Sequence, residues 1–205
     1  MKADYEPLLH PVDIASLRPT QMTVGMVEVA RKRVDWRKHA GQDGPDFLGR
    51  HMIPAVIGPK RRYHLIDHHH LVRALHDEGV AHVLVSVVAD LSGLAKPTFW
   101  TFMDNRNWLH PFDSTGKRRP YGQLPKAIED MQDDPYRSLA GAVRRAGGYA
   151  KDATPYSEFL WADFLRRKID PKLLEKHFEQ AVAKALDEAH HHDASYLPGW
   201  CGPDD

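Results

Sequence analysis

The stretch 63–75 constrains the fold more than any other part of the chain, because its pattern of apolar residues changes within it. The residues before Asp67 suit a short strand, whereas Leu71, Val72 and Leu75 follow helical spacing. We therefore expect a strand, a sharp turn at Asp67, and a helix that the Asp67 carboxylate caps. Such a junction presents unpaired N–H groups and the positive end of a helix dipole at one place, which suits a phosphate.

Apolar runs on both sides of this stretch predict a mixed arrangement of strands and helices. A first strand is expected over 11–17, and a helix follows to about residue 38. Residues 52–57 and 62–66 predict a hairpin whose second strand leads to Asp67. The valine-rich run 82–89 predicts a strand that is buried on both faces.

The second half of the chain is predicted to be mostly helical. The expected helices cover 97–108, 124–131, 135–146, 156–168 and a last segment that begins at Pro171. The predicted fold class is therefore α+β: residues 1–110 form a small mixed sheet with helices, and residues 111–205 form a helical extension packed on it.

Composition limits the classes of function. The chain has 28 Lys and Arg against 28 Asp and Glu, which disfavours a dedicated binder of duplex DNA. Its single cysteine, Cys201, cannot form a disulfide within the chain and fits a reducing compartment. The first residues lack the pattern of a signal peptide, and no run approaches the ~20 apolar residues of a membrane span. We expect a cytoplasmic protein with no membrane partner, and the oligomeric state stays open.

Four consecutive residues are the candidate catalytic group: Asp67, His68, His69 and His70. Neighbouring positions of a helix point about 100° apart, so a regular helix cannot direct all three imidazoles at one ligand, but an irregular turn can direct two. One histidine is expected to act as an acid or base, with His69 the first choice and Asp67 next. The opposing interpretation is a capped helix with solvent-exposed histidines.

The candidate cofactors are Mg²⁺ and a nucleotide, and the metal ligands stay unassigned. An Asp67 carboxylate together with substrate phosphates suits magnesium, which takes few carboxylates and keeps water. Zinc is disfavoured, because no HxxxH or HExxH spacing is present to close a site around it.

Three short boxes resemble a known family. The segment 65–71, Leu-Ile-Asp-His-His-His-Leu, is similar to the (V/I)-D-G-H-H-R box of the ParB/sulfiredoxin superfamily. Residues 13–25 resemble the strand and L-R-P-T-Q-x-x-V-G box of the ParB-like nucleases, and 197–200 resemble their C-terminal L-P-G-(W/Y). The chain departs from the central box at His68, where the family has glycine, and at Leu71, where it has arginine.

The resemblance implies a ParB/sulfiredoxin-type fold and an enzyme that acts on phosphate groups. Members of this superfamily include nucleotide hydrolases and an ADP-using kinase for free serine, so we expect a nucleotide or another small phosphorylated ligand as the partner. Arg73 is a candidate replacement for the missing arginine. Three residues of the first box are candidates for binding the phosphate or ligand: Arg18, Thr20 and Gln21.

Two other functions remain as alternatives. The family name suggests a nuclease, which would use the same residues on a phosphodiester and would have DNA as its partner. The third alternative is a non-catalytic binding module that keeps the fold without the activity, which the two departures from the central box support.

Overall fold

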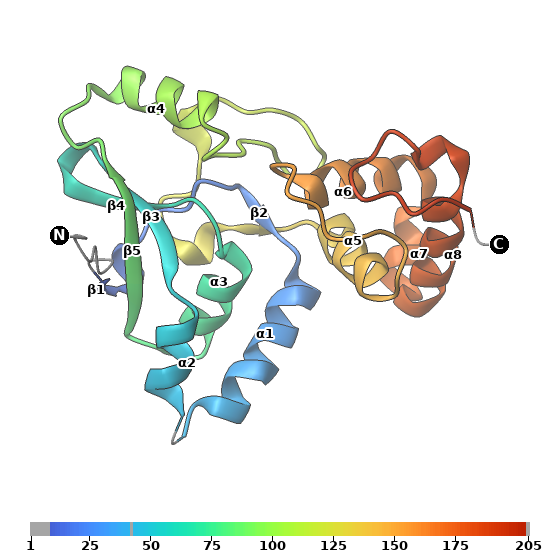
Figure 1. The fold of residues 1–205 in the computed structure, drawn as a ribbon, viewed down its shortest axis with the longest axis horizontal. Coiled ribbons are helices and arrows are strands. Elements are labelled where there is room, and N and C mark those ends of the chain that lie inside the picture. Colours follow the sequence, from blue (N-terminus) through green and yellow to red (C-terminus); the bar gives the residue numbers. More distant parts are fainter. Residues whose placement is uncertain (1–8, 42, 204–205) are drawn as a thin grey trace, which may run out of the picture. The chain divides into compact units, whose positions relative to one another are not determined.

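The computed structural model describes residues 9–41 and 43–203 and confirms an α+β fold (Figure 1). A mixed four-stranded sheet has the order β1-β5-β3-β4, formed by β1 (Leu9–Asp13), β5 (His82–Asp90), β3 (Ile53–Gly58) and β4 (Arg62–Leu65). The pairs β1–β5 and β3–β4 are antiparallel, and the pair β3–β5 is parallel. The predicted hairpin is therefore present, and β5 lies inside the sheet.

The first strand is shorter than predicted. It ends at Asp13, whose carboxylate accepts the Ala15 N–H at 3.0 Å and begins a 3₁₀ turn over Ile14–Ser16. The expectation that β5 is buried on both faces was also wrong. Val83 and Val85 are buried, but Val88 is 49% exposed, so one face of the strand's second half meets solvent.

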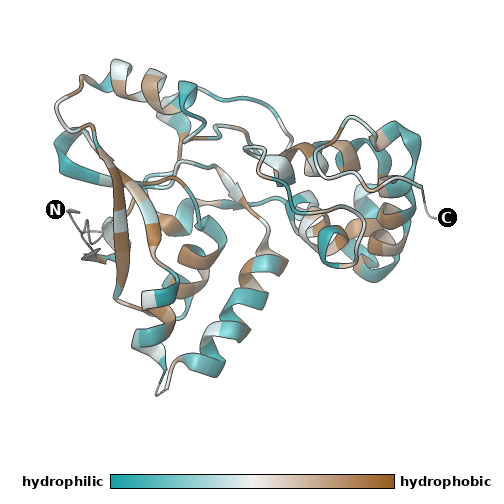
Figure 2. Ribbon diagram, viewed as in Figure 1, coloured by the Kyte–Doolittle hydropathy of each residue, from teal (hydrophilic) through white to brown (hydrophobic). Residues whose placement is uncertain are grey.

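Helix α3 (His69–Asp77) carries the apolar stripe that the sequence predicts. Leu71, Val72 and Leu75 are buried, and the helix ends before Gly79, which has the left-handed φ of 74° typical of a residue just past a helix. Figure 2 shows many hydrophobic residues in α3, β3 and β5, in contrast to the mostly hydrophilic helix α1 (Met26–His39).

Ion pairs connect helix α1 to the C-terminal end of helix α3. Arg33 and Arg37 both donate to the Glu78 carboxylate, at 2.6 Å and 2.7 Å, and these bonds lower the pKa of Glu78 to about 2. Two of the cations of α1 are thus neutralised. The short helix α2 (Gly44–Arg50) follows α1.

After β5 come helix α4 (Lys96–Asn105) and a long irregular segment. The helix predicted over 124–131 is absent except for a 3₁₀ turn at Ile128–Asp130. The backbone at Ala127 is extended (φ −139°, ψ 161°), which interrupts a helix through this segment, and the Arg73 guanidinium donates to the carbonyls of Glu129 and Met131. Next, β6 (Gln132–Asp133) pairs with β2 (Thr23–Val24) in a two-stranded sheet.

The remaining helices are α5 (Pro135–Arg145), α6 (Ser157–Lys168), α7 (Pro171–Lys176) and α8 (Phe178–His190). They enclose a core around Trp161, Leu139 and Leu165. Asp170 caps α7 as predicted, with its carboxylate 2.7 Å from the Lys172 N–H. The predicted single last helix is two helices, because the backbone at His177 (φ −141°, ψ 61°) leaves the helical region.

The chain forms two compact units that do not follow a single cut in the sequence. The first contains residues 1–23, 29–113 and 117–132, and the second contains 24–28, 114–116 and 133–205. The predicted domains, 1–110 and a helical extension 111–205 packed on the first, stay a prediction. Within the described ranges, no helix combines the length and apolar character needed to cross a bilayer.

Candidate functional site

The turn between β4 and α3 holds the predicted catalytic residues, but Asp67 does not cap the helix. Its carboxylate accepts the N–H of the next residue, His68, at 2.6 Å, and the residue at the cap position is His68 itself, which makes no side-chain cap bond. The prediction of an Asp67 cap was wrong because α3 begins at His69, one residue later than expected. The exposed Asp67 carboxylate therefore lies just outside the helix N-terminus.

His68 has an unusual backbone conformation. Its φ of 63° and ψ of 23° are left-handed, a region that costs most residues about 1–2 kcal/mol and that glycine adopts freely. This explains why the resembling box has glycine at this position. The half-buried imidazole has its pKa lowered by burial, and the charges of His51 and Lys32 add to that effect while Asp67 opposes it. His68 is therefore neutral at pH 7.

His69 connects the two predicted boxes. Its side chain is only 2% exposed, and its Nε2 atom accepts the Thr20 N–H at 3.2 Å. The Thr20 hydroxyl lies 3.4 Å from the same nitrogen and donates to the Leu65 carbonyl. His69 thus holds the 18–21 segment against the end of β4. His70, the third imidazole, is half-buried in the first turn of α3.

Gln21 and Arg73, two more of the predicted ligand-binding residues, contact other segments of the chain. Gln21 is 7% exposed and forms a parallel β-bridge with His110. The Arg73 guanidinium forms an ion pair with Asp77 at 3.0 Å and donates to the carbonyls of Glu129 and Met131. That geometry makes Arg73 a support for the 128–131 segment, and its phosphate-binding role stays a prediction.

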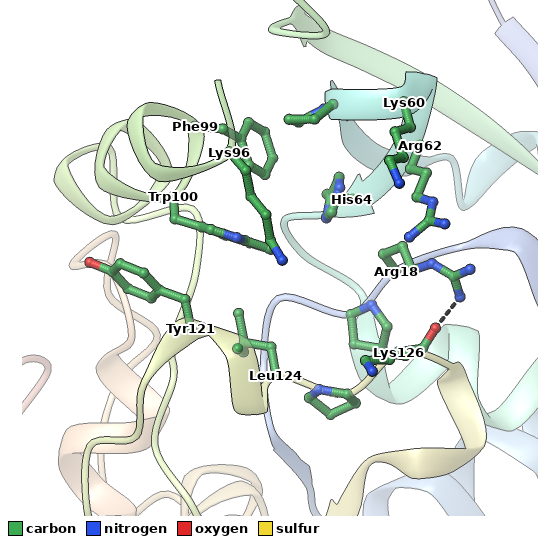
Figure 3. Close-up of a pocket in the computed structure, with 14 residues that line it drawn as sticks. Arg18, Lys60, Arg62, His64, Lys96, Phe99, Trp100, Tyr121, Leu124 and Lys126 are labelled. Carbon is green, nitrogen blue, oxygen red and sulfur yellow. Dashed lines mark hydrogen bonds between the residues drawn. The ribbon is translucent and has the colours of Figure 1, made fainter. Parts of the chain in front are cut away.

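The backbone of Arg18 pairs with β4, and its side chain lines a separate pocket. Its N–H donates to the Tyr63 carbonyl and its carbonyl accepts the Leu65 N–H, both at 2.9 Å, so the 18–21 segment continues the sheet edge beside β4. Its side chain reaches the Lys126 carbonyl and lines a pocket with Arg62 and His64 (Figure 3).

Sequence reasoning missed this pocket, although one signal was present. Arg62 and His64 alternate along β4, so a strand places both side chains on one face. The other walls come from segments far away in the sequence, which no local pattern can bring together. The loop 117–119 holds three cations, and two of them form ion pairs: Arg118 with Asp104 and Arg119 with Asp113.

The donor set at the turn suits a metal that takes most of its ligands from substrate and water. Among the described residues, no three His, Cys, Asp or Glu side chains gather into a metal-binding cluster. A single exposed carboxylate, Asp67, next to a helix N-terminus fits Mg²⁺, which uses one or two carboxylates and substrate oxygens.

Comparisons with known proteins agree with this fold. Residues 10–167 match the family described as "Putative ParB-like nuclease". A crystal structure of the protein Atu1540 from Agrobacterium tumefaciens is 52% identical, with a TM-score of 0.89, and the match covers 97% of this chain and 100% of that one. Among curated proteins, none matches the chain. Because the family match spans most of the sequence, the chain belongs to the family of ParB-like nucleases, as that description names it.

Proposed function

We propose that this protein is an enzyme that binds a nucleotide or another phosphorylated ligand at the 67–70 turn and transfers or hydrolyses a phosphoryl group. One observation carries the proposal. An exposed carboxylate, a neutral imidazole and the N-terminus of a nine-residue helix occupy three consecutive positions, Asp67, His68 and His69. Phosphoryl transfer needs a place for the phosphate, a group that orients or deprotonates the nucleophile, and compensation of charge.

Each of the three has a separate role. The N-terminus and the dipole of α3 attract a phosphate oxygen. His68 accepts the proton of the attacking water or hydroxyl, since its lowered pKa keeps it unprotonated at neutral pH. Asp67 would hold Mg²⁺, which supplies charge neutralisation to the phosphate when bound. His69 is a positioning residue in this scheme, because it fixes Thr20 against the turn.

The backbone at His68 supports a functional role for this side chain. A glycine would occupy the left-handed conformation without strain, yet the chain has an imidazole there. Strained residues persist where the surrounding structure requires them, and they are concentrated at functional sites.

The family description favours a second candidate, in which the same residues cleave a phosphodiester. In that case the partner is a nucleic acid and binding weakens steeply as salt increases. A binding module without catalysis is the remaining alternative, and it predicts binding at the turn with no turnover.

His68→Gly tests the proposal most sharply, because it removes the imidazole and the backbone strain together. We would measure phosphate release from ATP, ADP, CTP and GTP, and cleavage of labelled single-stranded and duplex DNA, with Mg²⁺ and with EDTA. Loss of a general base typically costs a factor of about 10²–10⁴ in rate. Relief of strain offsets the greater flexibility of glycine, so the free energy of unfolding should stay the same or rise by up to about 1 kcal/mol.

A fall in activity without a fall in stability would separate chemistry from misfolding. His82→Gly would be a poor control inside a strand, so the matched control is His82→Gln, which changes an exposed histidine of the same unit. Full activity in both His68→Gly and Asp67→Asn would refute the assignment of the turn. If wild type turns over none of the substrates but binds one of them, the non-catalytic module is the better description.

A further inference from the structure

A second site lies in the first unit and shares no residue with the 67–70 turn (Figure 3). It is a pocket with a cavity volume of about 240 Å³. Its walls come from the 18–19 segment, the turn between β3 and β4, β4 itself, α4 and the 121–126 segment. Sites for drug-sized ligands typically have roughly 300–1,000 Å³, so this pocket has room for one small ligand or one unit of a chain.

The charged side chains that line the pocket are all positive. Five of the side chains that line it are cationic and none is acidic: Arg18, Lys60, Arg62, Lys96 and Lys126. The whole chain has equal numbers of acidic and basic residues, so this is a local excess. Within the described part of the chain, none of the five forms an ion pair. Uncompensated cations around a concave surface attract an anion, and phosphate is the anion that clusters of Arg and Lys bind best.

Two buried nitrogen atoms in the pocket lack hydrogen-bond partners among the described residues. These are Nδ1 of His64, whose side chain is 7% exposed, and Nε1 of Trp100. Gly58 lies against the opposite side of the imidazole, since a Cβ there would come within 2.8 Å of His64 Nε2. Buried polar atoms are normally satisfied, and an unpaired one costs about 1–3 kcal/mol.

The other side of the pocket is aromatic. The rings of Trp100 and Tyr121 lie 6.1 Å apart at an angle of 27°, and the His64 ring packs against Phe99 and Trp100 with centroids at 4.8 Å and 5.3 Å. Figure 3 shows these aromatic side chains on one side of His64, and Arg62 and Arg18 on the other. A ligand between them meets flat apolar surface on the aromatic side, where Lys96 also lies, and positive charge on the other side.

We propose that this pocket binds a single nucleotide unit, with its base against Trp100 and Tyr121 and its phosphate among Lys60, Arg62 and Lys96. Stacking on aromatic side chains requires an unpaired base, so the ligand is not a continuous duplex. A free nucleoside monophosphate and the terminal nucleotide of a single strand share this chemistry. The site is independent of the phosphoryl chemistry at the turn.

The test is isothermal titration of the full-length protein in EDTA, which prevents magnesium-dependent turnover at the turn. The probes are AMP, GMP, CMP and UMP, inorganic phosphate, and a 5′-phosphorylated single-stranded hexanucleotide. Arg62→Gln removes a phosphate contact, and Trp100→Leu removes the stacking surface. Arg61→Gln is the matched control, because Arg61 is the exposed neighbour of Arg62 and does not line the pocket.

We expect at least one monophosphate to bind wild type and Arg61→Gln equally. Arg62→Gln should weaken binding at least tenfold, since bonds to charged groups are among the stronger ones. Trp100→Leu should weaken it between about fivefold and a hundredfold, the range for stacking of one base. A hexanucleotide that binds more tightly than the monophosphates, with a steep salt dependence, identifies a strand end as the source. Equal affinities identify the free nucleotide.

Three outcomes would overturn the proposal. One is the absence of binding of every nucleotide probe to wild type at millimolar concentration. Another is binding that Arg61→Gln weakens as much as Arg62→Gln, which would reflect general charge attraction. The third is inorganic phosphate binding as tightly as the nucleotides with no effect of Trp100→Leu, which would exclude recognition of a base. Circular dichroism of the two variants checks that they are folded before titration.

Discussion

The buried imidazole of His64 should make the stability of the protein fall as the pH falls. The ring is 7% exposed and packs between the aromatic side chains of α4 and the guanidinium groups of Arg18 and Arg62. Burial, together with these two positive charges, lowers the pKa of His64 from 6.5 to about 4. In the unfolded chain the imidazole has its ordinary pKa, so the two states take up a proton at different pH.

The sign and size of the effect follow from this difference. In the unfolded chain His64 binds a proton below pH 6.5, whereas in the folded protein it binds one only below about pH 4. Acid therefore favours unfolding. Each pH unit in this window costs about 1.36 kcal/mol. His64 alone should therefore remove about 2 kcal/mol of unfolding free energy between pH 7 and pH 5, and about 3 kcal/mol once the pH is below its folded pKa.

Urea unfolding at pH 7, 6 and 5, followed by tryptophan fluorescence, would measure this loss. His64→Leu keeps a side chain of similar bulk without a titrating group, so its loss between pH 7 and pH 5 should be about 2 kcal/mol smaller than that of wild type. His82→Gln, at an exposed position on β5, should retain the wild-type loss. Other titrating groups contribute equally to all three proteins and cancel in the comparison.

A loss in His64→Leu equal to that in wild type would refute the reasoning. It would mean that the imidazole binds a proton in the folded protein as readily as in the unfolded chain, so that the pocket is wetter or less positive than its geometry indicates. An NMR titration of the His64 ring would then show a pKa near 6.5, in place of about 4.

Two further substitutions test the roles that the structure gives to individual residues. Arg73→Gln should destabilise the protein by about 2–3 kcal/mol in urea unfolding, because it breaks the Asp77 ion pair and two bonds to carbonyls. Unchanged stability with lost phosphate binding would restore the predicted ligand role of Arg73. Gly25→Ala should cost about 1–3 kcal/mol, since its Cβ would lie 2.6 Å from the Ser138 nitrogen and hydroxyl. Its control, Gly49→Ala, meets nothing within 4 Å and should not lower the unfolding midpoint.

Much of the fold could be predicted from sequence because its signals are local. The hairpin of β3 and β4, the helix α3 with its end at Gly79, and the Asp170 cap of α7 all depend on residues within one or two turns of each other. The failures depend on partners elsewhere in the chain. Arg73, more than fifty residues away, donates to the carbonyls of Glu129 and Met131, a contact that no pattern in the 124–131 segment shows.

The candidate turn was located from sequence, but its geometry was not. The sequence indicates that Asp67 precedes a helix, yet whether it caps that helix depends on one residue of register and on the left-handed backbone at His68. The bond between Thr20 and His69 joins positions 49 apart in the chain. The Arg62 pocket gathers side chains from five segments, so sequence alone could show its two β4 members and not the site.

The two units alternate along the sequence, which affects both the order in which they are synthesised and the choice of fragments for expression. Residues 24–28 are synthesised before their partners, which come more than a hundred residues later: Met26 N–H binds the Asp133 carboxylate, and Glu28 pairs with Arg145. The second unit therefore cannot be completed until its later segment, which begins at residue 133, has also been synthesised. A gene fragment that ends near residue 110 contains residues 24–28 without their partners. A fragment that begins near residue 110 lacks residues 24–28. Circular permutation is a better route to dissecting this protein than truncation, because it keeps every segment in the chain.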